Sequence, residues 1–242
     1  MKKMKGVIAA GGIGSRLFPL THVTNKHLLP VYDEPMVHYP IRTLVKAGIT
    51  DILIITGGPH AGHFLRTLKN GHHLGVKHLE YAYQDNEGGI PRAISLAEEF
   101  ADGDNIAVIL GDNTTDANIK PVVDKFKAGG HLFLKKVPDP ERYGIPVFTP
   151  DGKSIIKTVE KPKDPQSSKA ITGLYLFDNT VFDIIRTLKP SKRGEFEVTD
   201  IHNVYLNRKQ LTWSDLVGFW SDAGKFETLF LANQYWAQKK QK

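Results

Sequence analysis

Two cations lie close in the sequence to a cluster of glycines near the start of the chain. Three glycines at positions 11, 12 and 14 follow an apolar run, and Arg16 and Lys26 come after them. Glycines directly after a strand let backbone N–H groups approach a phosphate closely, because no Cβ intervenes. A guanidinium and an ammonium group beside such a loop suit a polyphosphate. The pattern therefore predicts a polyphosphate site, although a glycine-rich turn without a ligand would use the same glycines.

Two well-known phosphate loops do not fit this stretch. The dinucleotide-binding pattern G-x-G-x-x-G would need glycine where Leu17 stands. A Walker loop would need Gly-Lys-Ser or Gly-Lys-Thr after its spacer, and neither follows this loop. A nucleotide bound here would therefore be held by another kind of loop.

Other polar residues follow predicted strands later in the chain. Asp112 comes after an apolar strand, where ligands of open α/β sheets bind, and it can hold Mg²⁺ or cap an Asx turn. Gln84 offers a paired donor and acceptor that suits a pyrimidine edge. Glu160 and Lys161 end a strand. Glu160 can accept hydrogen bonds from sugar hydroxyls and Lys161 can bind the phosphate of a sugar, or the two can simply form an exposed ion pair.

Strands and helices are expected to alternate in the first half of the chain. The expected strands are 6–10, 51–56, 79–83 and 106–110, and the expected helices are 35–47, 60–69, 90–100 and 119–128. Repeated β-α-β units predict a mostly parallel sheet with right-handed crossovers. Gly48 is expected to end the first helix.

The second half has a different pattern. Strands are expected at 132–137, 145–148, 154–160 and 170–177, and helices at 180–188, 198–207 and 226–239. Asp151-Gly152 is a hairpin turn signal between two of the strands. With no repeat and no low-complexity linker, the sequence predicts one continuous doubly wound α/β domain with an appended mixed sheet.

Composition excludes several classes of protein. The chain has 242 residues, 40% of them hydrophobic and 24% charged, as in ordinary globular proteins. Its net charge is +6, but the only dense basic run is at the last few residues, so cations around an anionic substrate explain the charge. The absence of cysteine excludes disulfides and thiolate zinc sites. Neither a signal peptide nor a membrane span is expected, so we expect a cytoplasmic protein that binds neither nucleic acid nor membrane.

Histidines are grouped in two places. His60 and His63 are three residues apart, and His72, His73 and His78 cluster. Metal sites often use such spacings, but no third ligand is evident. We therefore expect surface histidines.

The chain resembles the sugar-1-phosphate nucleotidyltransferase family. The similarity begins with G-G-x-G-x-R-L-x-P-L-T and N-K-x-L-L-P in residues 11–30. Later blocks keep the family's order across nearly the whole chain: QDNEGG, LGDN, DPERYG, EKP, TGLY, RGE, TDI and WSD. Glucose-1-phosphate thymidylyltransferases are the most similar members. The resemblance implies a Rossmann-like three-layer fold in a single domain, with a nucleotide-binding half (residues 1–130), a sugar-binding half (131–225) and a C-terminal helix (226–239).

This resemblance also implies an activity and a site. The implied reaction is magnesium-dependent transfer of a nucleoside monophosphate from dTTP, or UTP, to a sugar 1-phosphate, first of all glucose 1-phosphate. The implied catalytic cations are Arg16 and Lys26, and the implied Mg²⁺ ligands are Asp112 and Asp222. The implied nucleotide-binding residues are Ala10, Gly11, Gly12, Gly14, Gln84 and Gly89. The implied sugar-phosphate-binding residues are Tyr143, Gly144, Glu160, Lys161 and Arg193.

The chain departs from the family pattern in three ways. Pro91-Arg92-Ala93 replaces the usual Ala-Gln-Ala, and Arg92 could alter contacts near the nucleotide. Pro146 puts the pairing of its strand in doubt. Longer members carry a further helical segment used in assembly and feedback binding, so we expect a short form whose feedback regulation is open. We expect a monomer or a small homo-oligomer.

Two alternatives remain open at this point. One is a nucleotidyltransferase that uses UTP or another sugar phosphate. The other is a nucleotide-sensing homologue without turnover. Such a homologue would be expected to lose a catalytic cation or a metal carboxylate, whereas all four of these residues are present.

Overall fold

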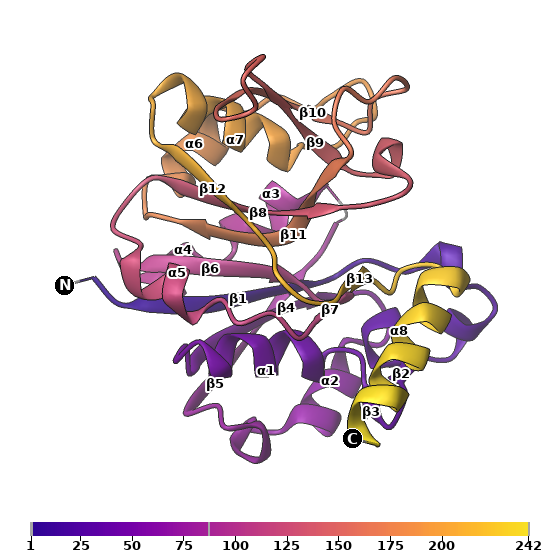
Figure 1. The fold of residues 1–242 in the computed structure, drawn as a ribbon. Helices are drawn as coiled ribbons and strands as arrows, with labels where there is room; N and C mark the ends of the chain where they lie inside the picture. The colour runs from indigo at the N-terminus through magenta and orange to yellow at the C-terminus, as the bar shows by residue number, and fades with distance from the viewer. Residues whose placement is uncertain (1, 87, 242) are drawn as a thin grey trace.

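A seven-stranded mixed sheet forms the middle layer of the molecule (Figure 1). The computed structural model of the chain describes residues 2–86 and 88–241. The strands of the sheet are β1 (Met4–Ala10), β4 (Asp51–Gly57), β5 (His78–Gln84), β6 (Asn105–Leu110), β8 (Gly130–Lys136), β11 (Lys169–Phe177) and β12 (Leu211–Asp215). Their order is β12-β8-β11-β6-β1-β4-β5. Strands β6, β1, β4 and β5 are parallel, whereas β11 runs antiparallel between β6 and β8, and β12 runs parallel to β8.

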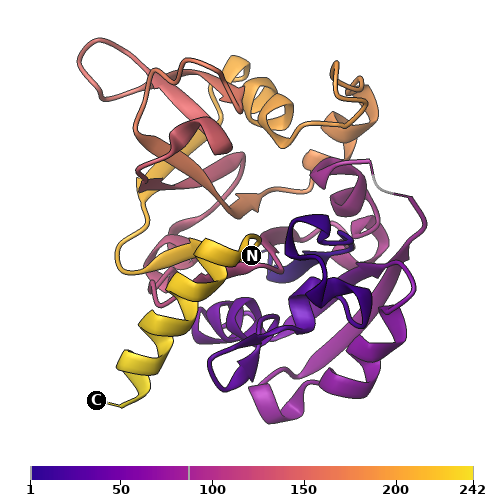
Figure 2. The same ribbon diagram turned by 90° about the vertical axis from the view of Figure 1, so that its right-hand side faces the viewer.

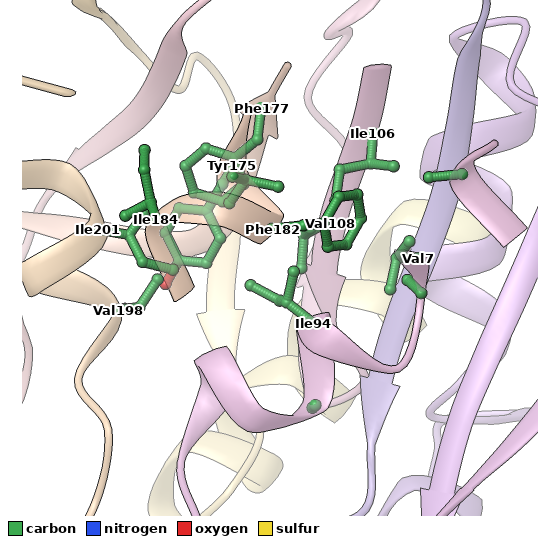
Figure 3. Close-up of a cluster of buried hydrophobic side chains, with 14 of the residues drawn as sticks. Val7, Ile94, Ile106, Val108, Tyr175, Phe177, Phe182, Ile184, Val198 and Ile201 are labelled. Carbon is green, nitrogen blue, oxygen red and sulfur yellow. The ribbon is translucent and has the colours of Figure 1, made fainter. Parts of the chain in front are cut away.

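Helices cover both faces of this sheet. They are α1 (His38–Lys46), α2 (Ala61–Leu68), α3 (Ile90–Ser95), α4 (Glu98–Ala101), α5 (Lys120–Lys125), α6 (Val181–Thr187) and α7 (Val198–Asn207). Because alternate residues of a strand point to opposite faces, Val7 of β1 joins the core under α3, α4, α6 and α7, and Ile8 joins the core under α1, α2 and α5. Figure 3 shows the first core, where Val7, Val108 and Phe182 meet between sheet and helices. Burial on both faces explains the continuous apolar sequences of β4 and β6.

The last helix, α8 (Phe226–Lys240), packs against the loops that follow β1 (Figure 2). Trp236 and Ala232 of this helix form a small core with Leu17 and Tyr39. The Asn233 side chain accepts a hydrogen bond from the Tyr32 N–H over 2.6 Å. Tyr235 and Lys239 both bind the Asp116 carboxylate. This helix is thereby tied to residues 1–130, the part of the chain that the family resemblance assigns to the nucleotide.

Two-stranded sheets complete the fold. They pair β2 (Pro30–Val31) with β3 (Glu34–Pro35), β7 (Asn113–Thr115) with β13 (Trp220–Asp222), and β9 (Gly144–Phe148) with β10 (Ile155–Glu160). In the β7–β13 sheet, Asp222 lies opposite Asn113. The Ala223 N–H also donates to the Asp112 carbonyl over 2.8 Å. Two segments far apart in the sequence are thus joined backbone to backbone.

Most of the expected elements are confirmed. The α/β fold with its mostly parallel Rossmann-like core is present, and α7 has the expected bounds. Gly48 follows α1 with φ 87°, a conformation that favours glycine at a helix end. Asp151-Gly152 forms the turn between β9 and β10. The division into nucleotide-binding and sugar-binding halves stays a prediction.

Several details differ from the sequence-based expectation. The helix expected at 90–100 is two short helices, α3 and α4. At the end of α3, the Ser95 hydroxyl donates to the Arg92 carbonyl, and this bond competes with helical hydrogen bonding. The helix expected from residue 35 begins at His38, because Glu34–Pro35 pairs with Pro30–Val31. Strand β9 pairs with β10 despite Pro146, which lies opposite Thr158. Of the strands in the second half, β8, β11 and the unexpected β12 extend the main sheet, and the β9–β10 hairpin stands apart from it.

No helix within residues 2–86 and 88–241 is long and apolar enough to cross a membrane.

Candidate active site

Two adjoining cavities lie beyond the carboxyl ends of the parallel strands, where open α/β sheets bind ligands. The first has a volume of about 250 Å³ and the second about 140 Å³. Both are lined by Ile90, Leu110 and Asp112, so they meet at these residues. The first contains Gly11, Gly12, Lys26, Gln84 and Gly89, and the second contains Arg16, Tyr143, Gly144, Glu160, Lys161 and Asp222. The structure therefore gathers most of the residues that the sequence singled out.

The glycine loop shapes the first cavity by making room for Lys26. Gly14 has φ 72°, and a Cβ there would lie 2.7 Å from Cβ of Lys26. The lysine side chain continues past Gly12, where a Cβ would lie 4.0 Å from Nζ. Arg16 follows in a short 3-10 helix, Ser15–Leu17, and is exposed. The loop thus leaves its backbone open and places one cation beside it and another at its rim.

Lys26 and Asp112 form an ion pair at the junction of the two cavities. Nζ lies 2.6 Å from Oδ2, and the two side chains are only 12% and 11% exposed. Burial alone would raise the pKa of the Asp112 carboxyl, but the charge of Lys26 and hydrogen bonds from Lys26 and Asn113 outweigh it and hold that pKa well below its usual range. Asp112 is therefore ionised, and Lys26 is its counter-ion.

His27 is a buried neighbour of this pair that the sequence did not single out. Its Nδ1 lies 2.7 Å from Oδ1 of Asn25, which also accepts the His27 N–H. Burial, with a smaller contribution from Lys26, lowers the pKa of His27 to about 3, so the imidazole is neutral. A Cβ at Gly111 would lie 2.7 Å from Cδ2 of His27, which explains why glycine precedes Asp112. The spacing of two residues between Asn25 and His27 is the only signal for this contact in the sequence.

Gln84 and Gly89 also line the first cavity, and a Cβ at Gly11 would lie 2.6 Å from Oε1 of Gln84. Gln84 ends β5, and its Nε2 donates to the Asn86 carbonyl over 3.0 Å. Gly89 has φ 89°, and a Cβ there would lie 2.1 Å from the Phe196 carbonyl oxygen. This position thus requires glycine to let the two segments approach.

Charged, hydroxyl and aromatic side chains form much of the wall of the second cavity. Glu160, at the end of β10, faces Gly144, where a Cβ would lie 3.1 Å from Oε2 of Glu160 and 2.9 Å from Cγ2 of Thr199. Burial raises the pKa of Glu160, and the nearby charge of Glu197 adds to the rise, although Lys161 and Arg193 oppose it. Tyr175 and Trp220 also line this cavity. Carboxylate, hydroxyl and aromatic groups together suit a small polyhydroxylated ligand.

Asp222 closes the second cavity beside Asp112. One of its oxygens accepts from the Tyr143 hydroxyl over 3.0 Å, and the other lies 3.2 Å from a guanidinium nitrogen of Arg142. Burial, and next the charge of Asp112, raise the pKa of Asp222. Arg142 also binds Asp139. It lies within the DPERYG block, but its type and position alone gave no reason to place it at Asp222.

The two aspartates fit a magnesium ion. Both line the second cavity, and the charge of Asp112 raises the pKa of Asp222, so a cation bound near both carboxylates would relieve this repulsion. Mg²⁺ commonly takes one or two carboxylates and completes its shell with phosphate oxygens and water. Within residues 2–86 and 88–241, no group of three or more histidines and carboxylates could hold a metal. The remaining ligands would have to come from substrate or solvent.

Other predicted residues lie less centrally. The Ala10 side chain is buried and lines neither cavity. Lys161 has φ 41° and is half exposed beside Glu160. Arg193 binds Glu195 over 3.0 Å and lies 3.8 Å from Glu160 without lining either cavity. The clustered histidines are outside the site and at least partly exposed, as expected: His60, His63, His72, His73 and His78.

Comparison with known proteins identifies relatives over nearly the whole chain. The family model described as nucleotidyl transferase matches residues 5–239. A glucose-1-phosphate thymidylyltransferase of Mycolicibacterium smegmatis is 43% identical over 237 residues, which span 96% of this chain and 82% of that protein. A Bacillus anthracis protein that is assigned as a glucose-1-phosphate thymidylyltransferase and was solved with sucrose has 47% identity and a TM-score of 0.91, covering 96% of this chain and 95% of its own. A UDP-glucose pyrophosphorylase with UDP-glucose shares the fold at a TM-score of 0.84 and 24% identity, covering 99% of this chain and 100% of its own.

Proposed function

The chain belongs to the nucleotidyl transferase family, and we propose that it transfers a thymidylyl group from dTTP to glucose 1-phosphate in the cytoplasm. The observation that carries this proposal is the junction of the two cavities at Asp112. One cavity offers a glycine loop and a lysine to a triphosphate, and the other offers polar side chains to a sugar. Two substrates bound side by side would meet at this junction.

The reaction needs no covalent enzyme intermediate. A phosphate oxygen of the sugar phosphate forms a bond to the α-phosphorus of dTTP, and the bond from that phosphorus to the pyrophosphate oxygen breaks. Lys26 and Arg16 lie at the glycine loop, where they would neutralise the triphosphate and the charge that develops during transfer. Holding both substrates in line would supply much of the remaining rate enhancement.

Asp112 and Asp222 would hold Mg²⁺, which when bound supplies further charge neutralisation on the phosphates. The chain's own residues orient these ligands. Tyr143 and Arg142 fix the Asp222 carboxylate, and the Asn113 amide donates to Asp112 over 3.0 Å. Neighbouring hydrogen bonds thus orient both carboxylates before any ligand binds.

Glu160, Tyr143 and Gly144 are the proposed sugar contacts. A buried carboxylate accepts hydrogen bonds strongly from hydroxyl groups. Lys161 and Arg193, both near Glu160, are the proposed cations for the phosphate of the sugar. Gln84 and Gly89 are the proposed contacts to the base.

UTP is the second candidate nucleotide. The amide of Gln84 offers a donor and an acceptor, and uracil and thymine present the same hydrogen-bonding edge to it. A substrate panel separates the candidates: kcat/KM would be measured by pyrophosphate release for dTTP, UTP, CTP, ATP and GTP with glucose 1-phosphate. We expect dTTP to give the highest value and both purines the lowest.

The same panel can reject the proposal. A purine preference would remove the base-reading role of Gln84. No pyrophosphate release with any pair of substrates from the folded wild-type protein would favour the nucleotide-sensing alternative. Galactose, mannose and N-acetylglucosamine 1-phosphates, each tested with dTTP, would decide which sugar phosphate is preferred.

A further inference from the structure

We propose that Lys26 acts before any substrate binds, as an internal counter-ion that occupies Asp112 and keeps the metal site closed to free divalent cations until a triphosphate draws the lysine away. The idea rests on the proposed function, because it takes the ligand of the glycine loop to be a triphosphate. In this second role of Lys26, its ion pair with Asp112 makes the triphosphate bind before the metal ion.

Both oxygens of Asp112 are engaged in the structure. Oδ2 lies 2.6 Å from Nζ of Lys26, and Oδ1 accepts from Nδ2 of Asn113 over 3.0 Å. The pair is nearly nine-tenths buried, so water screens it little. A metal ion that approached Asp112 would meet an ammonium group at contact distance from the oxygen it needs. Free Mg²⁺ should therefore bind weakly to the substrate-free protein.

Lys26 is placed so that it can move to a phosphate. Its stem passes Gly14, and its Nζ lies 4.0 Å from the point where a Cβ would stand on Gly12. A phosphate seated on the open backbone at Gly12 would thus lie beside the ammonium group. A lysine carries its charge on a flexible four-carbon stem, so a rotation of the side chain is enough to exchange partners.

Arg142, the cation at the other aspartate, is held differently. It binds Asp139 as well as Asp222, and its guanidinium lies 5.1 Å from the centre of the Tyr143 ring. Among the described residues, Lys26 has Asp112 as its ion-pair partner. The contrast identifies Lys26 as the cation that exchanges partners and Arg142 as the one that stays.

The exchange would couple the two ligands. A triphosphate carries several negative charges and attracts Lys26 more strongly than the single charge of Asp112 does. Once the lysine has left, Asp112 has no cationic partner and lines the second cavity together with Asp222, an arrangement that favours a divalent cation. By reciprocity, the cation then strengthens triphosphate binding by the same factor as the triphosphate strengthens cation binding.

The test uses Mn²⁺ as the probe, without any nucleotide or sugar phosphate. Free Mn²⁺ would be measured by electron paramagnetic resonance for wild type, Lys26→Met and the charge-matched control Lys120→Met. Lys120 also forms a lysine–aspartate pair, with Asp124 over 2.7 Å, but on the exposed helix α5. We expect Lys26→Met to bind one Mn²⁺ at least about tenfold more tightly than wild type. The control should bind like wild type, and adding Asp112→Asn to Lys26→Met should abolish the gain.

The proposal is overturned if Lys26→Met and wild type bind Mn²⁺ equally, or if the gain survives Asp112→Asn. Should Lys26→Met fail to fold, as judged by thermal unfolding, Lys26→Gln replaces it, because its amide removes the charge but still donates to Asp112. The readout requires no turnover. An inactive wild type with the expected Mn²⁺ gain would reject the proposed activity alone, and an active wild type without the gain would reject the counter-ion role alone.

Discussion

The two cavities of the site are lined by different kinds of group. Glycines line much of the first cavity, and Lys26 is the one lysine or arginine among the described residues that line it. The second cavity is walled by side chains from several elements, including Tyr143, Glu160 and Trp220. Phosphates can be recognised by the backbone N–H groups that every residue except proline carries, whereas a sugar must be recognised by side chains that only folding brings together. The first cavity should therefore depend on few residues with large effects, and the second on many with smaller ones.

Lys26→Ala should have the largest effect, because Lys26 supplies the positive charge in the lining of the first cavity. We expect turnover to fall on the order of 10²-fold or more, since the lost charge would act mainly on the transition state. Steady-state kinetics with dTTP and glucose 1-phosphate would measure it, and thermal unfolding would verify the fold. A folded variant with nearly normal kcat would break the contrast between the cavities.

Gly144→Ala should affect the second cavity alone. The added methyl group would lie 2.9 Å from Cγ2 of Thr199 and 3.1 Å from Oε2 of Glu160. It would narrow the cavity and displace Glu160, so we expect KM for glucose 1-phosphate to rise about tenfold while KM for dTTP changes less than about twofold.

A matched control exists in α2. A Cβ at Gly62 would meet nothing within 4 Å, so Gly62→Ala should leave both KM values unchanged. An equal rise in both KM values for Gly144→Ala would mean that the two cavities are not independent.

A buried histidine in α7, the helix that lines part of the second cavity, should make the protein less stable at acidic pH. His202 of α7 is fully buried against the rings of Tyr175 and Phe177, and burial lowers its pKa to about 3. Neither of its ring nitrogens has a hydrogen-bond partner among the described residues. The unfolded chain takes up a proton near pH 6.5 and the folded chain does not until about pH 3, so stability falls as the pH decreases through this window.

His202→Leu should weaken this dependence. The expected change in slope is at most about 1.4 kcal/mol per pH unit below pH 6.5, the value for one proton. Urea unfolding of wild type and variant between pH 7 and 5 would measure it. Equal slopes would show that the imidazole is not kept neutral by the fold.

Arg92→Gln should have the smallest effect. Arg92 departs from the family pattern, but its side chain packs beside Gly88 and lines a separate depression with Tyr83 and Gln84 rather than the first cavity. We expect kcat/KM for dTTP to stay within about twofold of wild type, as for a substitution outside the reacting groups. A tenfold loss would extend the nucleotide site to the Arg92 side chain.

The same contrast explains what could be predicted from the sequence. The three glycines of the loop lie within twenty residues of Arg16 and Lys26, so the loop could be recognised. Buried parallel strands give continuous apolar runs, so the core strands could be recognised as well. Strand β12 is short and lies at the edge of the sheet, and its sequence, Leu211–Asp215, gives a weak pattern. His27 and Arg142 were missed because their roles come from burial and from partners that sequence spacing does not reveal.

Pairing between β7 and β13 has a consequence for biosynthesis. The strand that carries Asp222 leaves the ribosome more than a hundred residues after the strand beside which it docks. Chains are made from the N-terminus and their early parts can fold first. The glycine loop can therefore form on a growing chain before Asp222 has been made, so a nascent or prematurely terminated chain holds Lys26 and Asp112 without the second carboxylate that we propose for the metal.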